Sequence, residues 1–198
     1  MRSCRCLCLL VVLGTVLPLA LQAQQSATHP KAASAVDNDF VHKQFGATCT
    51  LVAGPPPLTA DLDGDGIEDV VIVARCSNPL MDQTENNYKV VDPYNSFFGY
   101  GDPKITTQFA SEDPQGRGLS LLIIHGSGPE AWRSANPKAK FIIINLPFKQ
   151  LSVKKLTERK KTIMAIYAEE AREGEGTVSV VFWDGKKYKY RPLGSIMD

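Results

Sequence analysis

The stretch DLDGDGIEDVVIVA, residues 61–74, joins an acidic, glycine-rich turn directly to a run of apolar residues. Carboxylates occupy its first, third, fifth and ninth positions: Asp61, Asp63, Asp65 and Asp69. Carboxylates this close repel one another unless a cation neutralises them, and calcium, a hard ion that prefers oxygen ligands, does this well. The β-branched run that follows is typical of a strand. The stretch therefore predicts a calcium loop that leads into a β-strand.

The backbone of this turn is suited to coiling around an ion. Gly64 and Gly66 allow positive φ angles, and the carbonyl of Ile67 is the expected main-chain ligand at the seventh position. An EF-hand would need a glutamate at the twelfth position and a helix after it, but Ile72 stands there and the exit is β-branched. The loop is therefore not of the EF-hand type. A solvated turn without an ion is the alternative.

The pattern D-x-D-G-D-G-x-x-D resembles the calcium loop of FG-GAP and VCBS-type repeats, which occur in integrin β-propellers and in many bacterial surface proteins. The resemblance covers about one repeat, residues 45–75, and implies that the four aspartates bind a structural calcium ion. A propeller needs several blades, and the sequence contains no second loop of this kind. We therefore expect a mainly β fold of antiparallel sheets with blade-like local structure, packed as a sandwich or a truncated propeller-like unit.

The beginning of the sequence indicates export. Arg2 and Arg5 precede an apolar stretch at 7–21, and Ala23 offers a small residue for cleavage, so residues 1–23 are predicted to be a signal peptide. A membrane anchor is the alternative, which the shortness of the apolar run disfavours. Residues 24–38 are predicted to be a flexible leader and 39–198 a single β-rich domain. We expect a periplasmic or secreted protein with no membrane span after removal of the signal.

Two cysteines of the expected mature chain, Cys49 and Cys76, flank the calcium loop. In an oxidising compartment such a pair predicts a disulfide, which would stabilise the fold by about 3–4 kcal/mol. A zinc or redox site is the alternative, but it would need CxxC spacing or neighbouring histidines. The sequence has neither.

Alternating and apolar patterns predict several further elements. A capped helix is expected near 37–45 and a helical piece at 129–135. Residues 162–168 also fit one face of a helix, but their apolar character on both faces favours a strand. An Asp184-Gly185 turn predicts a hairpin, and its sequence at 180–188 resembles the closing hairpin of small secreted bacterial proteins with one such loop. The predicted strands are 48–53, 70–75, 119–125, 140–148, 162–168, 177–183 and 186–191.

The segment 77–118 shows no clear strand but is rich in aromatic residues. Long loops within a compact domain are usually functional or disordered, and aromatic density argues against disorder. Exposed rings could stack on sugars or grip a peptide; alternatively they pack over an open face of the sheet. The candidate ligand surface comprises Tyr88, Tyr94, Phe97, Phe98 and Tyr100.

Catalysis is not favoured by the sequence. The run 121–128, with His125 and two glycines, resembles the oxyanion turn of α/β-hydrolases, but no G-x-S-x-G elbow follows and no histidine follows His125. A formal net charge of +1 implies no nucleic acid partner. We expect a calcium-stabilised, non-catalytic module that binds a glycan or an envelope or surface protein. The alternatives are a small envelope hydrolase acting on glycans or esters and a structural accessory subunit.

Overall fold

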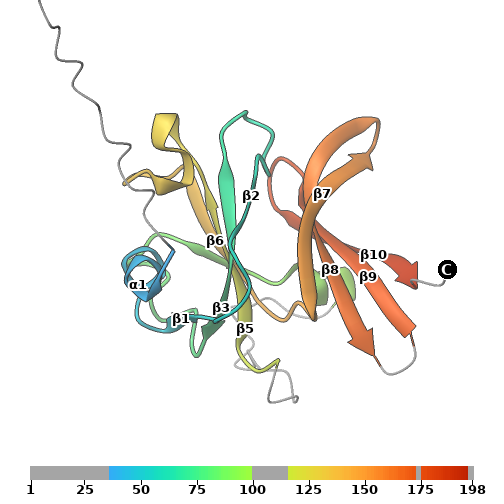
Figure 1. Cartoon of the computed structure of the whole chain (residues 1–198), viewed down its shortest axis with the longest axis horizontal. Helices are drawn as coiled ribbons and strands as arrows, with labels where there is room; N and C mark the ends of the chain where they lie inside the picture. Colours follow the sequence, from blue (N-terminus) through green and yellow to red (C-terminus); the bar gives the residue numbers. More distant parts are fainter. Residues whose placement is uncertain (1–35, 100–115, 173–174, 196–198) are drawn as a thin grey trace, which may run out of the picture. The chain divides into compact units, whose positions relative to one another are not determined.

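The computed structural model describes residues 36–99, 116–172 and 175–195. Within these ranges the protein is mainly β, as predicted, with two sheets and few short helices (Figure 1). In chain order the elements are α1 (Asn38–Phe45), β1 (Cys49–Leu51), β2 (Leu58–Ala60), β3 (Asp69–Cys76), β4 (Lys89–Val91), α2 (Pro93–Phe97), β5 (Leu119–His125), the 3-10 helix η1 (Gly128–Arg133), β6 (Ala139–Ile143), β7 (Gln150–Glu158), β8 (Lys161–Arg172), β9 (Glu175–Trp183) and β10 (Tyr188–Ser195).

The first sheet is built around β3. Its strand order is β1-β3-β5-β6-β4, and β2 also pairs with β3. The pairings are antiparallel except for that of β4 with β6, which is parallel. β1 and β2 pair with opposite ends of β3, opposite Cys76 and Asp69 respectively. The strand after the acidic turn is therefore central to this sheet.

The second sheet is an antiparallel meander of β7, β8, β9 and β10. The turn between β7 and β8 contains Arg159 and Lys160, both with positive φ. The predicted hairpin between β9 and β10 is confirmed: the Asp184 carboxylate accepts the backbone N–H groups of Lys186 and Lys187 across the turn.

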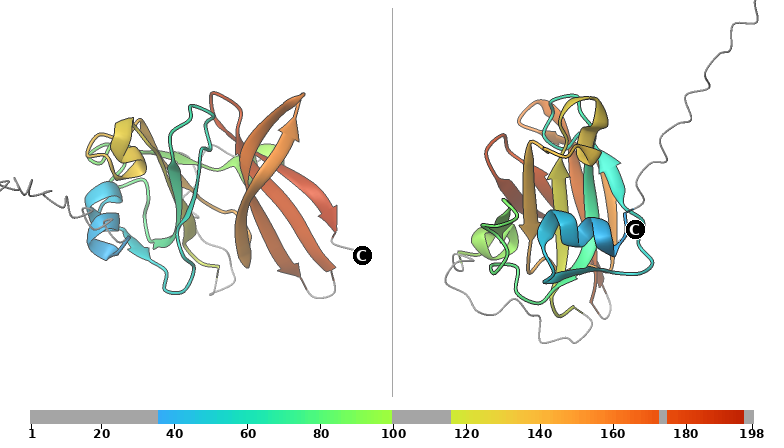
Figure 2. Two further views of the ribbon diagram at one scale, coloured as in Figure 1. Left: turned by 45° about the horizontal axis from the view of Figure 1, so that its top comes forward. Right: turned by 90° about the vertical axis from the view of Figure 1, so that its left-hand side faces the viewer.

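Both faces of β3 are buried, which explains its continuous apolar sequence. On one face, Val70 and Ile72 pack with Phe45 of α1, and Figure 2 shows this helix lying across the first sheet. On the other face, Val71 and Val73 belong to a cluster that includes residues of the second sheet, such as Ile166, Val181 and Tyr188. The first sheet is thus the middle layer between α1 and the second sheet.

The disulfide between Cys49 and Cys76 is confirmed, and it joins paired positions of β1 and β3. No helix in the described ranges has both the length and the apolar character needed to cross a bilayer.

Most predicted elements are present, with corrections. The α1 helix is capped by Asp37, and Val36 packs against the core, so the fold begins before the predicted leader ends. The strand predicted at 140–148 ends at Ile143, and Asn145 then adopts positive φ. Residues 129–135 are partly helical, as η1. Three strands were not predicted: β2, β4 and β7.

Candidate functional site: the acidic loop and the aromatic surface

The loop between β2 and β3 gathers three of the predicted calcium ligands. Asp61, Asp63 and Asp65 each offer a carboxylate oxygen, and these oxygens lie within 4.8 Å of one another. The turn is coiled by hydrogen bonds to Asp61: Oδ1 accepts the N–H groups of Gly64 (2.8 Å) and Asp65 (3.1 Å), and Oδ2 accepts that of Gly66 (2.9 Å). Gly64 and Gly66 have φ angles of 78° and 85°, as the sequence predicted.

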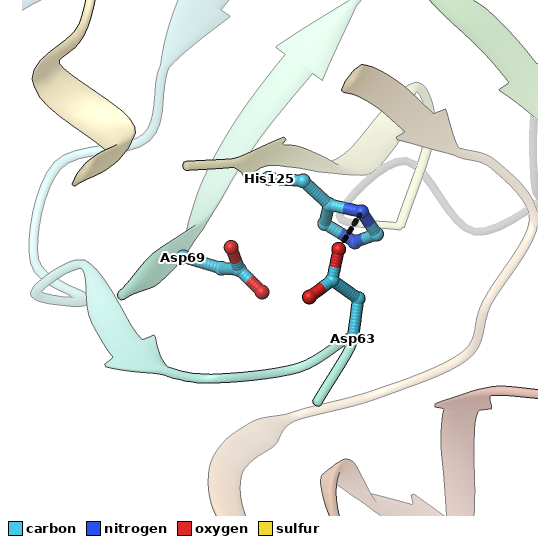
Figure 3. Close-up of side chains that lie close together, drawn as sticks. All are labelled: Asp63, Asp69 and His125. Atoms are coloured by element: carbon cyan, nitrogen blue, oxygen red, sulfur yellow. Dashed lines mark ion pairs between the residues drawn. The ribbon is translucent and has the colours of Figure 1, made fainter. Parts of the chain in front are cut away.

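The fourth predicted ligand, Asp69, lies where β3 begins and is fully buried; it groups with Asp63 and His125, and not with Asp61 and Asp65. Its Oδ2 accepts the N–H of Leu62 and its Oδ1 accepts that of Gly126, both at 2.8 Å. Burial raises the pKa of Asp69 to about 6, against the effect of these two hydrogen bonds. Asp69 groups with Asp63 and His125 (Figure 3), so it holds the loop to the end of β5.

His125 joins the loop to the second sheet. Its Nδ1 lies 3.3 Å from Asp63 Oδ2 (Figure 3), and its Nε2 lies 2.7 Å from the hydroxyl of Tyr188 on β10. Burial lowers the pKa of His125, although the charge of Asp63 opposes this. A neutral ring protonated on Nδ1 satisfies both contacts, since Tyr188 then donates to Nε2 and Nδ1–H donates to Asp63. Phe141 and Trp183 pack around the ring.

Lys138, which the sequence did not predict as part of the site, places a positive charge beside two of the loop aspartates. Lys138 Nζ lies 2.8 Å from Asp63 Oδ2 and 2.6 Å from Asp65 Oδ2. Hydrogen bonds to these two carboxylates raise the pKa of Lys138, and the contact with Lys138 lowers the pKa of Asp65. Lys138 follows Asp65 by 73 positions in the chain, so no local pattern could have identified it.

The segment after β5 packs closely against the loop. The indole N–H of Trp132 donates to Glu68 Oε1 at 2.9 Å, and Arg133 lies 3.5 Å from the same oxygen. A Cβ atom added to Gly126 would lie 2.4 Å from the carbonyl oxygen of Glu68 and 2.9 Å from Cγ2 of Ile67. The conformation of the loop therefore depends on a glycine at 126.

The donor set fits a hard divalent cation. The three clustered aspartates supply only oxygen ligands, the type that calcium prefers. A carboxylate oxygen has two lone pairs, so Asp61 Oδ2, which accepts a single backbone N–H group, can also bind an ion. The N–H of Ile67 donates to Asp65 Oδ1 at 2.9 Å, within the same turn, and its carbonyl as a ligand remains a prediction.

The predicted aromatic surface is present in part. Phe97 and Phe98, on and just after α2, are 49% and 50% exposed. Both lie against Tyr190 of β10, with ring centroids 5.4 and 6.2 Å away, and Tyr94 packs against Phe98 and Tyr190 at 5.1 Å. We call Tyr94, Phe97 and Phe98 the aromatic surface; Tyr190, on which they pack, is buried and belongs to the core.

Tyr88 does not belong to the aromatic surface, which corrects the prediction. It is 3% exposed, it packs against Phe45 in the core, and its hydroxyl donates to the carbonyl of Pro79 at 2.7 Å. The prediction was wrong because aromatic density does not distinguish a ring that closes a core from one that faces solvent. Tyr100 lies outside the described residues.

Comparisons with protein families, with curated proteins and with solved structures gave no match. The likeness to FG-GAP and VCBS-type repeats therefore stands on the residues of the loop alone.

Proposed function

We propose that the protein is a periplasmic or secreted, non-catalytic binding module that is stabilised by calcium and uses the aromatic surface to bind a glycan of the cell envelope. The observation that carries the binding function is the pair of half-exposed rings, Phe97 and Phe98. Large apolar side chains normally lose most of their exposure on folding, and adjacent exposed rings often mark an interaction site. Export is supported by the predicted signal peptide, residues 1–23, and by the disulfide.

The two rings are held in place before any ligand binds. Asp92 caps α2: its Oδ1 accepts the N–H of Asn95 at 2.9 Å, and its Oδ2 accepts the side-chain amides of Asn95 and Asn145, each at 2.6 Å. Asp92 is itself buried, so this network anchors α2 to the chain beyond β6. A preorganised surface loses less conformational entropy on binding, which suits the flat stacking of a sugar ring.

Calcium has a structural role in this proposal. Asp61, Asp63 and Asp65 would hold the ion, with Asp69 fixing the loop behind them and the Ile67 carbonyl as a further ligand. The ion would neutralise carboxylates that otherwise repel one another, so its binding would stabilise the folded state.

The alternative of a hydrolase finds no support in the position of His125. His125 is buried, with 2% of its side chain exposed, and both ring nitrogens face partners, Asp63 and Tyr188. A general base must reach the proton it abstracts, and this ring lies among aromatic side chains. The contacts of His125 suit a structural role that links the loop to β10.

The binding proposal is tested with the double variant Phe97→Ala/Phe98→Ala, assayed on an array of envelope glycans and by titration of the best ligand. Loss of stacking should weaken binding by about tenfold or more. Met81→Ala is the matched control, because Met81 is the most exposed large apolar residue in the described ranges (69%) and lies outside the aromatic surface. Unchanged binding by the double variant, or capture of a protein but of no glycan, would contradict the proposal.

A further inference from the structure

The ammonium group of Lys138 contacts one oxygen, Oδ2, of each of two carboxylates that the proposed calcium ion would use. Its Nζ lies within 2.8 Å of both Asp63 and Asp65, whose side chains are 3% and 26% exposed. These are two of the three clustered aspartates. Without a metal ion, Lys138 therefore supplies the positive charge that allows these carboxylates to lie close together.

The backbone of Lys138 is fixed, whereas its side chain is half-exposed to solvent. The backbone N–H of Lys138 donates to the carbonyl of His125 at 3.0 Å, and β6 begins at the next residue, Ala139. The backbone position of Lys138 beside the loop is therefore fixed. Its side chain is 49% exposed, so a rotation about its side-chain bonds can carry the ammonium group into solvent without unfolding any strand.

A lysine and a divalent cation cannot share these oxygens. Two positive centres in contact with the same carboxylate oxygens repel each other strongly at this distance, and the ammonium group has no lone pair with which to bind a metal ion. Binding of the ion through these Oδ2 oxygens then breaks both Lys138 contacts. The released ammonium group regains its hydration in solvent.

We propose that Lys138 is a built-in competitor of calcium: it occupies Asp63 and Asp65 when the loop is free of metal, and calcium binding displaces it into solvent. This inference rests on the proposed calcium loop. It predicts a loop that keeps its shape without the ion and that binds calcium more weakly than its aspartates alone would allow. Such a loop would fill only where calcium is abundant, as it is outside the cytoplasm.

The competition is measured with Lys138→Met, which keeps an unbranched side chain of the length of lysine up to Cε and removes the charged ammonium group. Calcium affinity by calorimetry should rise about tenfold or more, and the melting temperature in EGTA should fall. Lys186→Met is the control, since it makes the same change of net charge at an exposed turn. Lys138→Arg, which keeps the charge, should bind calcium no more tightly than the wild type.

The native protein offers a second test that does not depend on the folding of a variant. Reductive methylation followed by mass spectrometry should label Lys138 slowly in EGTA and several-fold faster in calcium, with Lys186 unchanged between the two. Wild type and Lys138→Met binding calcium equally, or Lys138 labelling that calcium does not raise, would overturn the competition and leave the calcium site standing. Absence of calcium binding in both proteins would overturn the calcium proposal and the competition together.

Discussion

Gly126→Ala tests whether the segment after β5 determines the shape of the acidic loop. The added Cβ would lie 2.4 Å from the Glu68 carbonyl oxygen, 2.8 Å from the carbonyl carbon of Ala131 and 2.9 Å from Cγ2 of Ile67. Two of these atoms belong to the backbone and cannot turn aside as a flexible side chain would. The strain is purely steric, because Gly126 does not have a positive φ.

The expected cost follows from two effects. Overpacking of a close contact costs about 1–3 kcal/mol. Movement of Gly126 also lengthens its hydrogen bond to the buried Asp69, and a buried acceptor without its donor costs about 1–3 kcal/mol. Partial relaxation makes the two effects less than additive, so we expect the free energy of unfolding to fall by about 2–4 kcal/mol. For a domain of this size that lowers the melting temperature by roughly 5–15 °C.

The assay is urea denaturation and thermal melting in EGTA and in calcium, with Gly185→Ala as the control. Gly185 has open space around it but a φ of 96°, so its substitution should cost only about 1 kcal/mol of backbone strain. Gly126→Ala should also reduce the stabilisation by calcium, because the displaced loop carries Asp63 and Asp65. A loss of stability no larger than that of Gly185→Ala would refute the argument from packing.

Two further predictions concern charge. Asp63→Asn/Asp65→Asn should abolish the rise in melting temperature on adding calcium. In the wild type, a hundredfold excess of calcium over Kd should raise the free energy of unfolding by about 2.7 kcal/mol. A rise in melting temperature that persists in the double variant would contradict the site. Burial raises the pKa of Tyr88 to about 12, above its usual value near 10, so the folded state keeps a proton that the unfolded state releases between these values. Stability should therefore fall by about 2–3 kcal/mol as the pH rises from 10 to 12, and Tyr88→Phe should remove that part of the decline where Tyr167→Phe does not. The free energy of unfolding is measured by urea denaturation at each pH. An equal fall in this free energy between pH 10 and 12 in the wild type, Tyr88→Phe and Tyr167→Phe would disprove the effect.

Local sequence signals predicted the elements that local chemistry determines. The strand at 119–125, the hairpin around Asp184-Gly185 and the positive φ angles of Gly64 and Gly66 all follow from short-range patterns, and each is confirmed. The disulfide was predicted from the expected oxidising compartment and from the presence of two cysteines in the expected mature chain. The structure contains it, and the pairing of β1 with β3 places Cys49 opposite Cys76.

Interactions between distant segments could not be predicted in this way. β7 is an edge strand whose sequence includes Lys154 and Lys155, so its apolar pattern is weak, and it is recognised only by its pairing with β8. β4 is three residues long and depends on β6 for its pairing. The contact of Lys138 with Asp65 joins residues 73 positions apart, and only the folded chain brings them together.

β3 contributes alternate side chains to two hydrophobic clusters, one shared with α1 and one shared with the second sheet. A domain with two separate clusters can lose one and retain the other, which populates partly open forms. Here neither cluster can dissolve without exposing one face of the same strand, and that strand is tied at one end by Cys76 and at the other by Asp69. We therefore expect unfolding in a single cooperative step, with the amide protons of β3 the last to exchange with solvent and few open forms for proteases to cleave.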